Sequence, residues 1–172
     1  MAPFSDAGVG YDRWMSKFVG DQLNDALLSR LGIDRALECA DRAFVLCTID
    51  EHGWAHPAMA SSLELVARDR TNVRIALGTR SRTVRNLQAD GRLTLIVVDD
   101  ASAHYIKGDV RLLAPTLAAR TDHSKFNLRV DSVLEDIAAD YEHARITSGI
   151  RIDRDPPDPA AARALLDELL AE

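Results

Sequence analysis

The sequence predicts a mainly β fold with flanking helices. Short runs rich in β-branched and other apolar residues alternate with turn signals through the middle of the chain. One helical pattern interrupts these runs, and leucines at helical spacing mark both ends. The chain has 172 residues, 47% of them hydrophobic, which suits one domain with a substantial core. We therefore treat residues 1–172 as a single domain.

The amino-terminal part predicts helices over about residues 11–40. Four apolar residues at spacings of three and four favour a short amphipathic helix: Tyr11, Trp14, Met15 and Phe18. A leucine stripe from 21 to 40 favours two further helical pieces separated at Gly32. Asp34 is the expected N-cap of the second piece.

Two runs, 43–49 and 55–66, predict strands joined by a turn at 50–53. The second run has mostly small side chains between 58 and 62. Small residues in a strand allow a flat ligand to approach the backbone closely. They also fit a crowded barrel interior, and both interpretations remain open.

The middle of the chain predicts a strand, a helix and another strand. The first strand covers 73–77, and the second covers 93–98. Ser81 stands at the N-cap position of the helix between them, and Asp-Gly at 90–91 ends that helix.

Charge is spread unevenly over the chain, whose net charge is −6. Residues 68–92 hold seven arginines and two aspartates, a local charge of +5 that leaves −11 for the rest. This balance argues against a general nucleic-acid binder and points to a local anionic partner such as a small phosphate. Arg80, Arg82 and Arg85 surround the predicted helix N-terminus, whose free amides favour an anion. A solvated basic helix is the alternative.

The remaining runs predict a strand at 104–112, bent at Gly108, and a strand at 126–130. For the residues that follow, a helical stripe to Tyr141 and a strand that continues to about 135 both fit. A short final strand is expected within 144–152.

Asp158 as N-cap and Pro159 at the first helical position predict a carboxy-terminal helix over about 158–171.

Other patterns exclude some function classes. The two cysteines and five histidines lack metal-ligand spacing, so no metal site is predicted. No pattern of paired acids or nucleophile and base indicates catalytic residues. Signal-peptide and membrane-spanning patterns are missing as well, which predicts a cytoplasmic protein without a membrane partner.

Residues 81–87, Ser-Arg-Thr-Val-Arg-Asn-Leu, resemble the turn and helix of the pyridoxamine 5′-phosphate oxidase-like family. Pro57 with the strand after it, and Gly108, are similar to that family's second and fifth strands. The order of predicted elements also matches. The resemblance implies a six-stranded antiparallel split β-barrel of the FMN-binding, Greek-key type.

The resemblance also implies an FMN site. Ser81 and Arg82 would hold the phosphate, and the backbone of 60–63 would lie along the flavin ring. The full set of implied cofactor-binding residues is Ala60, Ser61, Ser62, Leu63, Ala76, Leu77, Arg80, Ser81, Arg82, Thr83 and Arg85.

Three residues depart from the family's basic residues: Ala60, Leu65 and Thr83. Each change removes a charge-assisted contact of ~1.5–3 kcal/mol. Arg80 or Arg85 would have to compensate, and a deazaflavin or haem are alternative ligands.

The implied function is an FMN-dependent oxidoreductase acting on an unidentified small molecule with an unidentified electron donor. The alternative is a non-catalytic protein that binds or sequesters a flavin, deazaflavin or haem. The family's Arg-x-His substrate motif is missing, which argues against pyridoxamine phosphate oxidation. The resemblance further implies a homodimer with the cofactor at the interface, where Tyr105 and Lys107 are candidates for contributing to the partner's site.

Overall fold

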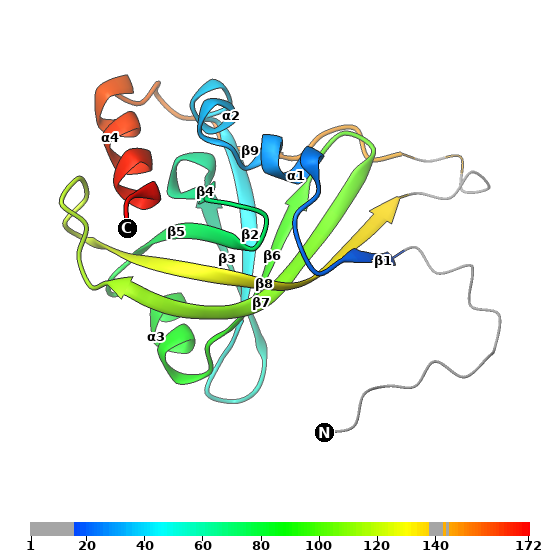
Figure 1. Ribbon diagram of the computed structural model, residues 1–172, viewed down its shortest axis with the longest axis horizontal. Coiled ribbons are helices and arrows are strands. Elements are labelled where there is room, and N and C mark those ends of the chain that lie inside the picture. Colours follow the sequence, from blue (N-terminus) through cyan, green and yellow to red (C-terminus); the bar gives the residue numbers. More distant parts are fainter. Residues whose placement is uncertain (1–15, 138–142, 144) are drawn as a thin grey trace.

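The protein is described by a computed structural model covering residues 16–137, 143 and 145–172. Its described part forms one antiparallel nine-stranded sheet that curls into a half-barrel (Figure 1). The main strand order is β3-β2-β6-β7-β8-β5-β4, with β1 beside β8 and β9 beside β2. The strands are β1 (Ser16–Gly20), β2 (Arg42–Ile49), β3 (Ala55–Ser61), β4 (Leu65–Ala67), β5 (Asn72–Gly78), β6 (Arg92–Val98), β7 (Ser102–Ala114), β8 (His123–Ile137) and β9 (Ile150–Arg151). The helices are α1 (Asp25–Arg30), α2 (Ile33–Glu38), α3 (Arg82–Ala89) and α4 (Pro159–Leu170), with a 3-10 turn, η1, at Ser62–Glu64.

The predicted mainly β fold of split-barrel type is confirmed. The six strands expected from the sequence are β2, β3 and β5 to β8. The run 55–66, however, is not one strand. It breaks at η1 because Ser61 and Glu64 cap this turn reciprocally through side chain and backbone.

The amino-terminal expectations are partly wrong. Ser16–Gly20 is a strand paired with the end of β8, with Phe18 opposite Leu134. Pairing with this long strand decides its conformation, whereas the helical spacing is only a local preference. Residues 11–15 of the predicted helix lie outside the described part.

The two helical pieces α1 and α2 are confirmed, but Asp34 is not the N-cap. Gly32 takes that position because it lies between the C-cap of α1 and the first residue of α2. Asp34 lies in the first turn of α2, where a carboxylate interacts favourably with the helix dipole.

The strand alternative for the residues after 130 is confirmed, and the helical one is wrong over 133–137. β7 holds this segment extended, with Ser102 opposite Ile137 and Tyr105 opposite Leu134. The rest of that predicted stripe, to Tyr141, lies outside the described part. The final strand is shorter than expected and covers only Ile150–Arg151.

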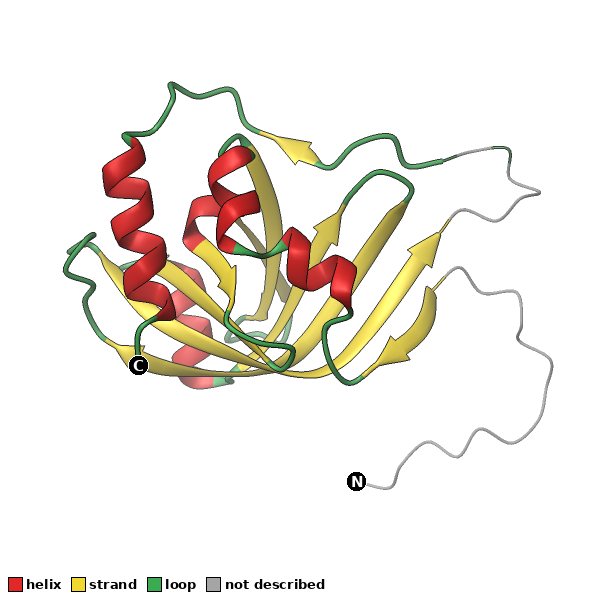
Figure 2. Ribbon diagram, turned by 45° about the horizontal axis from the view of Figure 1, so that its top comes forward, coloured by secondary structure: helices red, strands yellow, loops and turns green. Residues whose placement is uncertain are grey.

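Two apolar clusters hold the elements together. The first fills the curled sheet and takes in side chains of α1 and α3. The second lies on the other face of β4 and β5, beneath α2 and α4 (Figure 2). Figure 1 shows α3 on the opposite side of the long β7 and β8 strands from α1, α2 and α4. None of the described helices has the length and apolarity needed to cross a membrane.

Gly108 lies at an irregularity of the β7–β8 pairing, as the sequence predicts, but the extra residue of the bulge is Asp131 on β8. The β7–β8 register shifts between Lys107 and Gly108, and a Cβ at this position would lie 1.8 Å from the carbonyl oxygen of Arg129. Any side chain there must push the two strands apart.

We expect Gly108→Ala to lower the free energy of unfolding by about 3 kcal/mol or more, because overpacking forces the backbone to move. Gly78→Ala is the control, because a Cβ at Gly78 meets no atom within 4 Å. Urea unfolding measures both variants, and equal stability of the two would contradict the packing argument.

Candidate functional site

A polar corner forms where β5 passes into α3. β5 ends at Gly78, and the Ser81 amide donates to the Gly78 carbonyl over 2.9 Å. Ser81 then caps α3, its Oγ accepting from the Val84 amide over 3.1 Å, as the sequence predicts. The first amides of α3 therefore open towards solvent at this corner.

The barrel interior fixes the position of α3. Val84 and Leu87 are buried in the first apolar cluster. Between them, the Asn86 side-chain amide donates to Thr48 Oγ1 on β2 over 3.0 Å, and both residues are buried. This buried bond ties the helix to the strand beneath it, so the corner is held rigidly.

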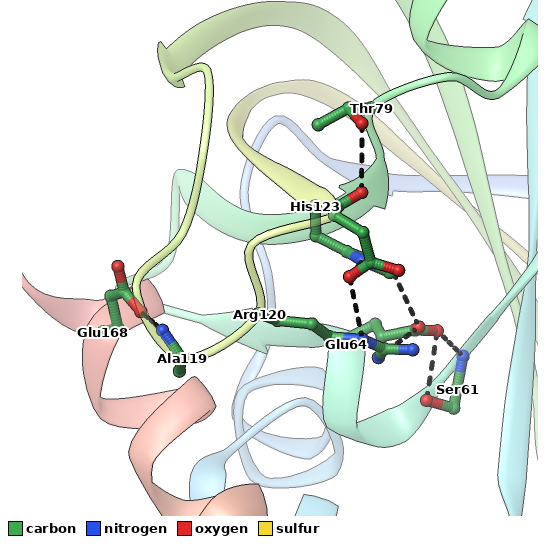
Figure 3. Close-up of polar contacts among 8 residues, drawn as sticks. Ser61, Glu64, Thr79, Ala119, Arg120, His123 and Glu168 are labelled. Carbon is green, nitrogen blue, oxygen red and sulfur yellow. Dashed lines mark hydrogen bonds and ion pairs between the residues drawn. The ribbon is translucent and has the colours of Figure 1, made fainter.

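A cavity of about 480 Å³ lies at the corner. Its lining residues are Gly78, Thr79, Arg80, Ser81, Thr121 and Asp122. The loop before β8 forms its second wall, because the Thr79 amide and hydroxyl both contact the Asp122 carbonyl, over 2.9 and 3.2 Å (Figure 3). The volume falls within the range of small-molecule sites.

Charges at the corner mostly favour an anion. Arg80 lines the cavity, and Arg82 and Arg85 are exposed on α3. Within the described part of the chain, no carboxylate lies within ion-pair distance of these three guanidiniums. The carboxylate of Asp122 opposes them, and its hydrogen bond with His123 lowers the pKa of this carboxyl group. A bound phosphate would interact favourably with the arginines and amides and unfavourably with Asp122.

A network around Glu64 lies next to the corner (Figure 3). Glu64 Oε2 accepts from the amide and the hydroxyl of Ser61, over 2.9 and 3.1 Å. Its Oε1 accepts from Arg120 over 2.8 Å and lies 3.5 Å from His123 Nε2. The network joins η1 to the loop before β8. No cluster of three potential metal ligands occurs among the residues that the structure covers.

The predicted ring-contact residues have mixed surroundings. The side chain of Ala60 lies in the first cluster, and Leu63 packs in the second cluster with α4. Ser61 is committed to Glu64, and Ser62 donates to the carbonyls of Ala36 and Cys39, over 3.2 and 2.8 Å. β3 ends the main strand order, so backbone groups on its outer side have no neighbouring strand. The free edge of β3 and a cavity of about 180 Å³ beside α4, which Ser61 and Leu63 line, remain for a flat ligand.

Among the other predicted residues, Arg80 and Ser81 line the corner cavity. Ala76, Leu77 and Thr83 are buried, Ala76 in the second cluster and Leu77 in the first. Their side chains therefore pack within the fold.

Sequence reasoning missed Thr79, Thr121 and Asp122 on the cavity wall, and the network of Glu64, Arg120 and His123. The polar composition of residues 116–125 is a weak signal for this loop. Its position, however, depends on the pairing of His123 with Gly78, which only the structure reveals.

The arginines of the basic segment 68–92 lie at several separate sites in the structure. Arg70 contacts the Leu23 carbonyl and Asp25 near α1, and Arg92 pairs with Asp90. Arg74 is buried on the sheet face beneath α4, away from the corner. Only Arg80, Arg82 and Arg85 remain at α3.

Comparison with known sequences identifies one relative that decides the family. The uncharacterized protein YclD of Bacillus subtilis is 34% identical over 141 residues, which cover 82% of this chain and 90% of YclD. The chain belongs to the YclD family. A scan against protein-family models finds no match.

Solved structures share the fold. A Lactobacillus delbrueckii protein provisionally assigned as a pyridoxamine 5′-phosphate oxidase superposes with a TM-score of 0.51 at 13% identity, covering 66% of this chain and 94% of that one. HupZ of Group A Streptococcus gives 0.50 at 10% identity, covering 68% and 99%. At these identities the likeness establishes the split-barrel fold.

We expect Glu64→Ala to lower the free energy of unfolding by about 1–3 kcal/mol, because the buried Ser61 amide loses its acceptor. Glu64→Gln keeps an oxygen at this position and should lose less stability. Urea unfolding of both variants measures the difference. Equal losses would show that the acceptor at Ser61 is not what stabilises η1.

Proposed function

We propose that the protein binds FMN at the corner between β5 and α3 and acts as a flavin-dependent oxidoreductase on a small molecule. The observation that carries the proposal is the cavity at a capped helix N-terminus, lined by Arg80 and Ser81 and connected to the end of β3 through His123, Glu64 and Ser61. This arrangement offers an anion site and a surface for a flat ring side by side.

The phosphate end fits the residues present. The first-turn amides of α3 and the guanidiniums of Arg80 and Arg82 supply donors for a phosphate dianion. Thr83 is buried and supplies no charge. The exposed arginines therefore replace the basic residue that usually follows the Ser-Arg pair in similar proteins. The negative charge of Asp122 lowers the affinity for the phosphate.

The ring end rests on the small residues of β3. Bound FMN would supply hydride transfer, whereas the chain binds and orients it. Glu64 fixes Ser61 at the end of the edge strand, so the backbone that faces the ring is rigid. The cofactor class follows from the resemblance of residues 81–87 to the pyridoxamine 5′-phosphate oxidase-like family.

We also propose that two copies of the chain form a homodimer through the outer face of the sheet. Cross-strand pairing aligns a row of side chains over six strands on this face: Met59, Val45, Ile96, Tyr105, Leu134 and Phe18. Met59 and Phe18 are 57% and 60% exposed. An apolar row of this length is typical of an interface. Tyr105 and Lys107, the candidates for reaching a partner's site, lie on the same face.

The absorption spectrum of the purified protein tests the function. We expect flavin bands near those of free FMN that bleach with NADH or NADPH under anaerobic conditions. Bound flavin that neither donor reduces would support the non-catalytic alternative. A Soret band would assign the site to haem and contradict the FMN proposal.

We expect Arg82→Ala to weaken FMN binding about tenfold or more while the fold is kept, because a charge-assisted contact to phosphate is lost. Fluorescence quenching titrations measure the dissociation constants. Riboflavin, which lacks the phosphate, should bind the variant and the unchanged protein equally.

Two further variants sharpen this test. Asp122→Asn removes the opposing carboxylate and should strengthen FMN binding. Arg92→Ala removes an arginine at the far end of α3 and should leave the affinity unchanged. If Arg82→Ala weakens riboflavin and FMN alike, the arginine does not contact the phosphate.

We expect Val45→Glu to convert a dimer into a monomer, because a carboxylate is placed within the apolar row. Light scattering after size exclusion measures the mass, and FMN titration measures the accompanying loss of affinity. His52→Glu, in the exposed turn between β2 and β3, is the control. An unchanged protein that is monomeric at micromolar concentration would refute the dimer.

A further inference from the structure

A second cavity, of about 300 Å³, lies between the carboxyl end of α4 and the strands β5, β7 and β8. Figure 1 shows this end of α4 above β5, away from the corner at α3. Four basic side chains line the cavity: Arg68, Arg74, Arg111 and Lys125. It shares no lining residue with the corner cavity.

Strand pairing brings the basic groups together. Arg74 on β5 and Arg111 on β7 both lie opposite Asn127 on β8, so the three form one cross-strand row. Lys125 lies two residues before Asn127, and therefore on the same face of β8. Basic residues that are far apart in the sequence thus meet at one place.

Arg74 is the group whose charge is not balanced. The residue is only 4% exposed, and one of its terminal nitrogens donates to Asn127 Oδ1 over 2.9 Å. Its buried Nε has no hydrogen-bond partner, and no carboxylate in the described part of the chain lies within ion-pair distance. Burial lowers the pKa of Arg74, as do the nearby charges of Arg68 and Arg111, while the charges of Glu172 and Asp69 act in the opposite direction. A buried guanidinium without a carboxylate in direct contact is costly.

The neighbouring groups are already engaged. Lys125 Nζ donates to the carbonyls of Glu168 and Ala171 at the end of α4, each over 2.8 Å. Glu168 accepts from two amides of the loop before β8, and Glu172 pairs with Arg68. Four basic side chains against two carboxylates leave two positive charges in the cavity.

We propose that this cavity binds a phosphate group, held chiefly by Arg74 and Arg111. A dianion matches the two uncompensated charges, and guanidinium groups suit the oxygens of a phosphate. Inorganic phosphate and a phosphate monoester share this chemistry. The bound group would link the end of α4 to three strands.

Calorimetric titration with inorganic phosphate tests the proposal, at constant ionic strength set with chloride because exposed charges are screened by salt. Besides any event at the α3 corner, which Arg82→Ala weakens, we expect one binding event that Arg111→Gln weakens about tenfold or more and Arg74→Met abolishes. Arg111 is exposed, so its variant should fold even where Arg74→Met does not. Glycerol phosphate, compared with inorganic phosphate, shows whether a monoester enters.

Two controls separate this cavity from other effects. Arg163→Gln removes an arginine on the exposed side of α4 and should keep full affinity. Arg82→Ala should leave the event that depends on Arg74 and Arg111 unchanged and weaken only phosphate binding at the α3 corner. Equal phosphate affinity in Arg111→Gln and the unchanged protein would overturn the proposal. Tighter binding of succinate than of phosphate would overturn the assignment to a phosphate group.

Discussion

The anchoring of α3 inside the barrel is the constraint on which the candidate site depends. Val84 and Leu87 remove apolar surface from water, and the bond from Asn86 to Thr48 satisfies two polar groups in the interior. Together they fix the direction in which the first amides of the helix open. The corner is therefore preorganised, and a bound anion would not bear the cost of ordering the helix.

Packing inside the barrel also explains why two positions differ from the pyridoxamine 5′-phosphate oxidase-like family. Ala60 and Leu65 stand where basic residues are usual, and both side chains lie in the first apolar cluster. A lysine or arginine there would need a partner inside the barrel to offset its desolvation. Basic groups at the corner are instead carried by Arg80 and Arg82, which remain in solvent. Such contacts are weaker and more sensitive to salt than buried ones.

Local sequence signals predicted the local structure well. Caps at Ser81 and Asp158 and the bend at Gly108 follow from single-residue chemistry, and alternation located the six main strands. The sequence could not predict features that depend on distant pairing. β1 exists because β8 offers an edge for it, and Asp122 reaches the corner because His123 pairs with Gly78. The candidate site was therefore predicted on its α3 side and missed on its loop side.

The alternation of side chains along β5 also separates the α3 corner from the cavity that Arg74 lines. Val73, Ile75 and Leu77 point into the barrel, whereas Arg74 points to the opposite face with Ala76. Ala76 packs in the cluster beneath α4 and lies between Arg74 and the corner along the strand. Because this packed layer separates the two cavities, which share no lining residue, an anion at the corner makes no contact with Arg74. We therefore expect a substitution at one cavity to change the anion affinity of that cavity and not of the other.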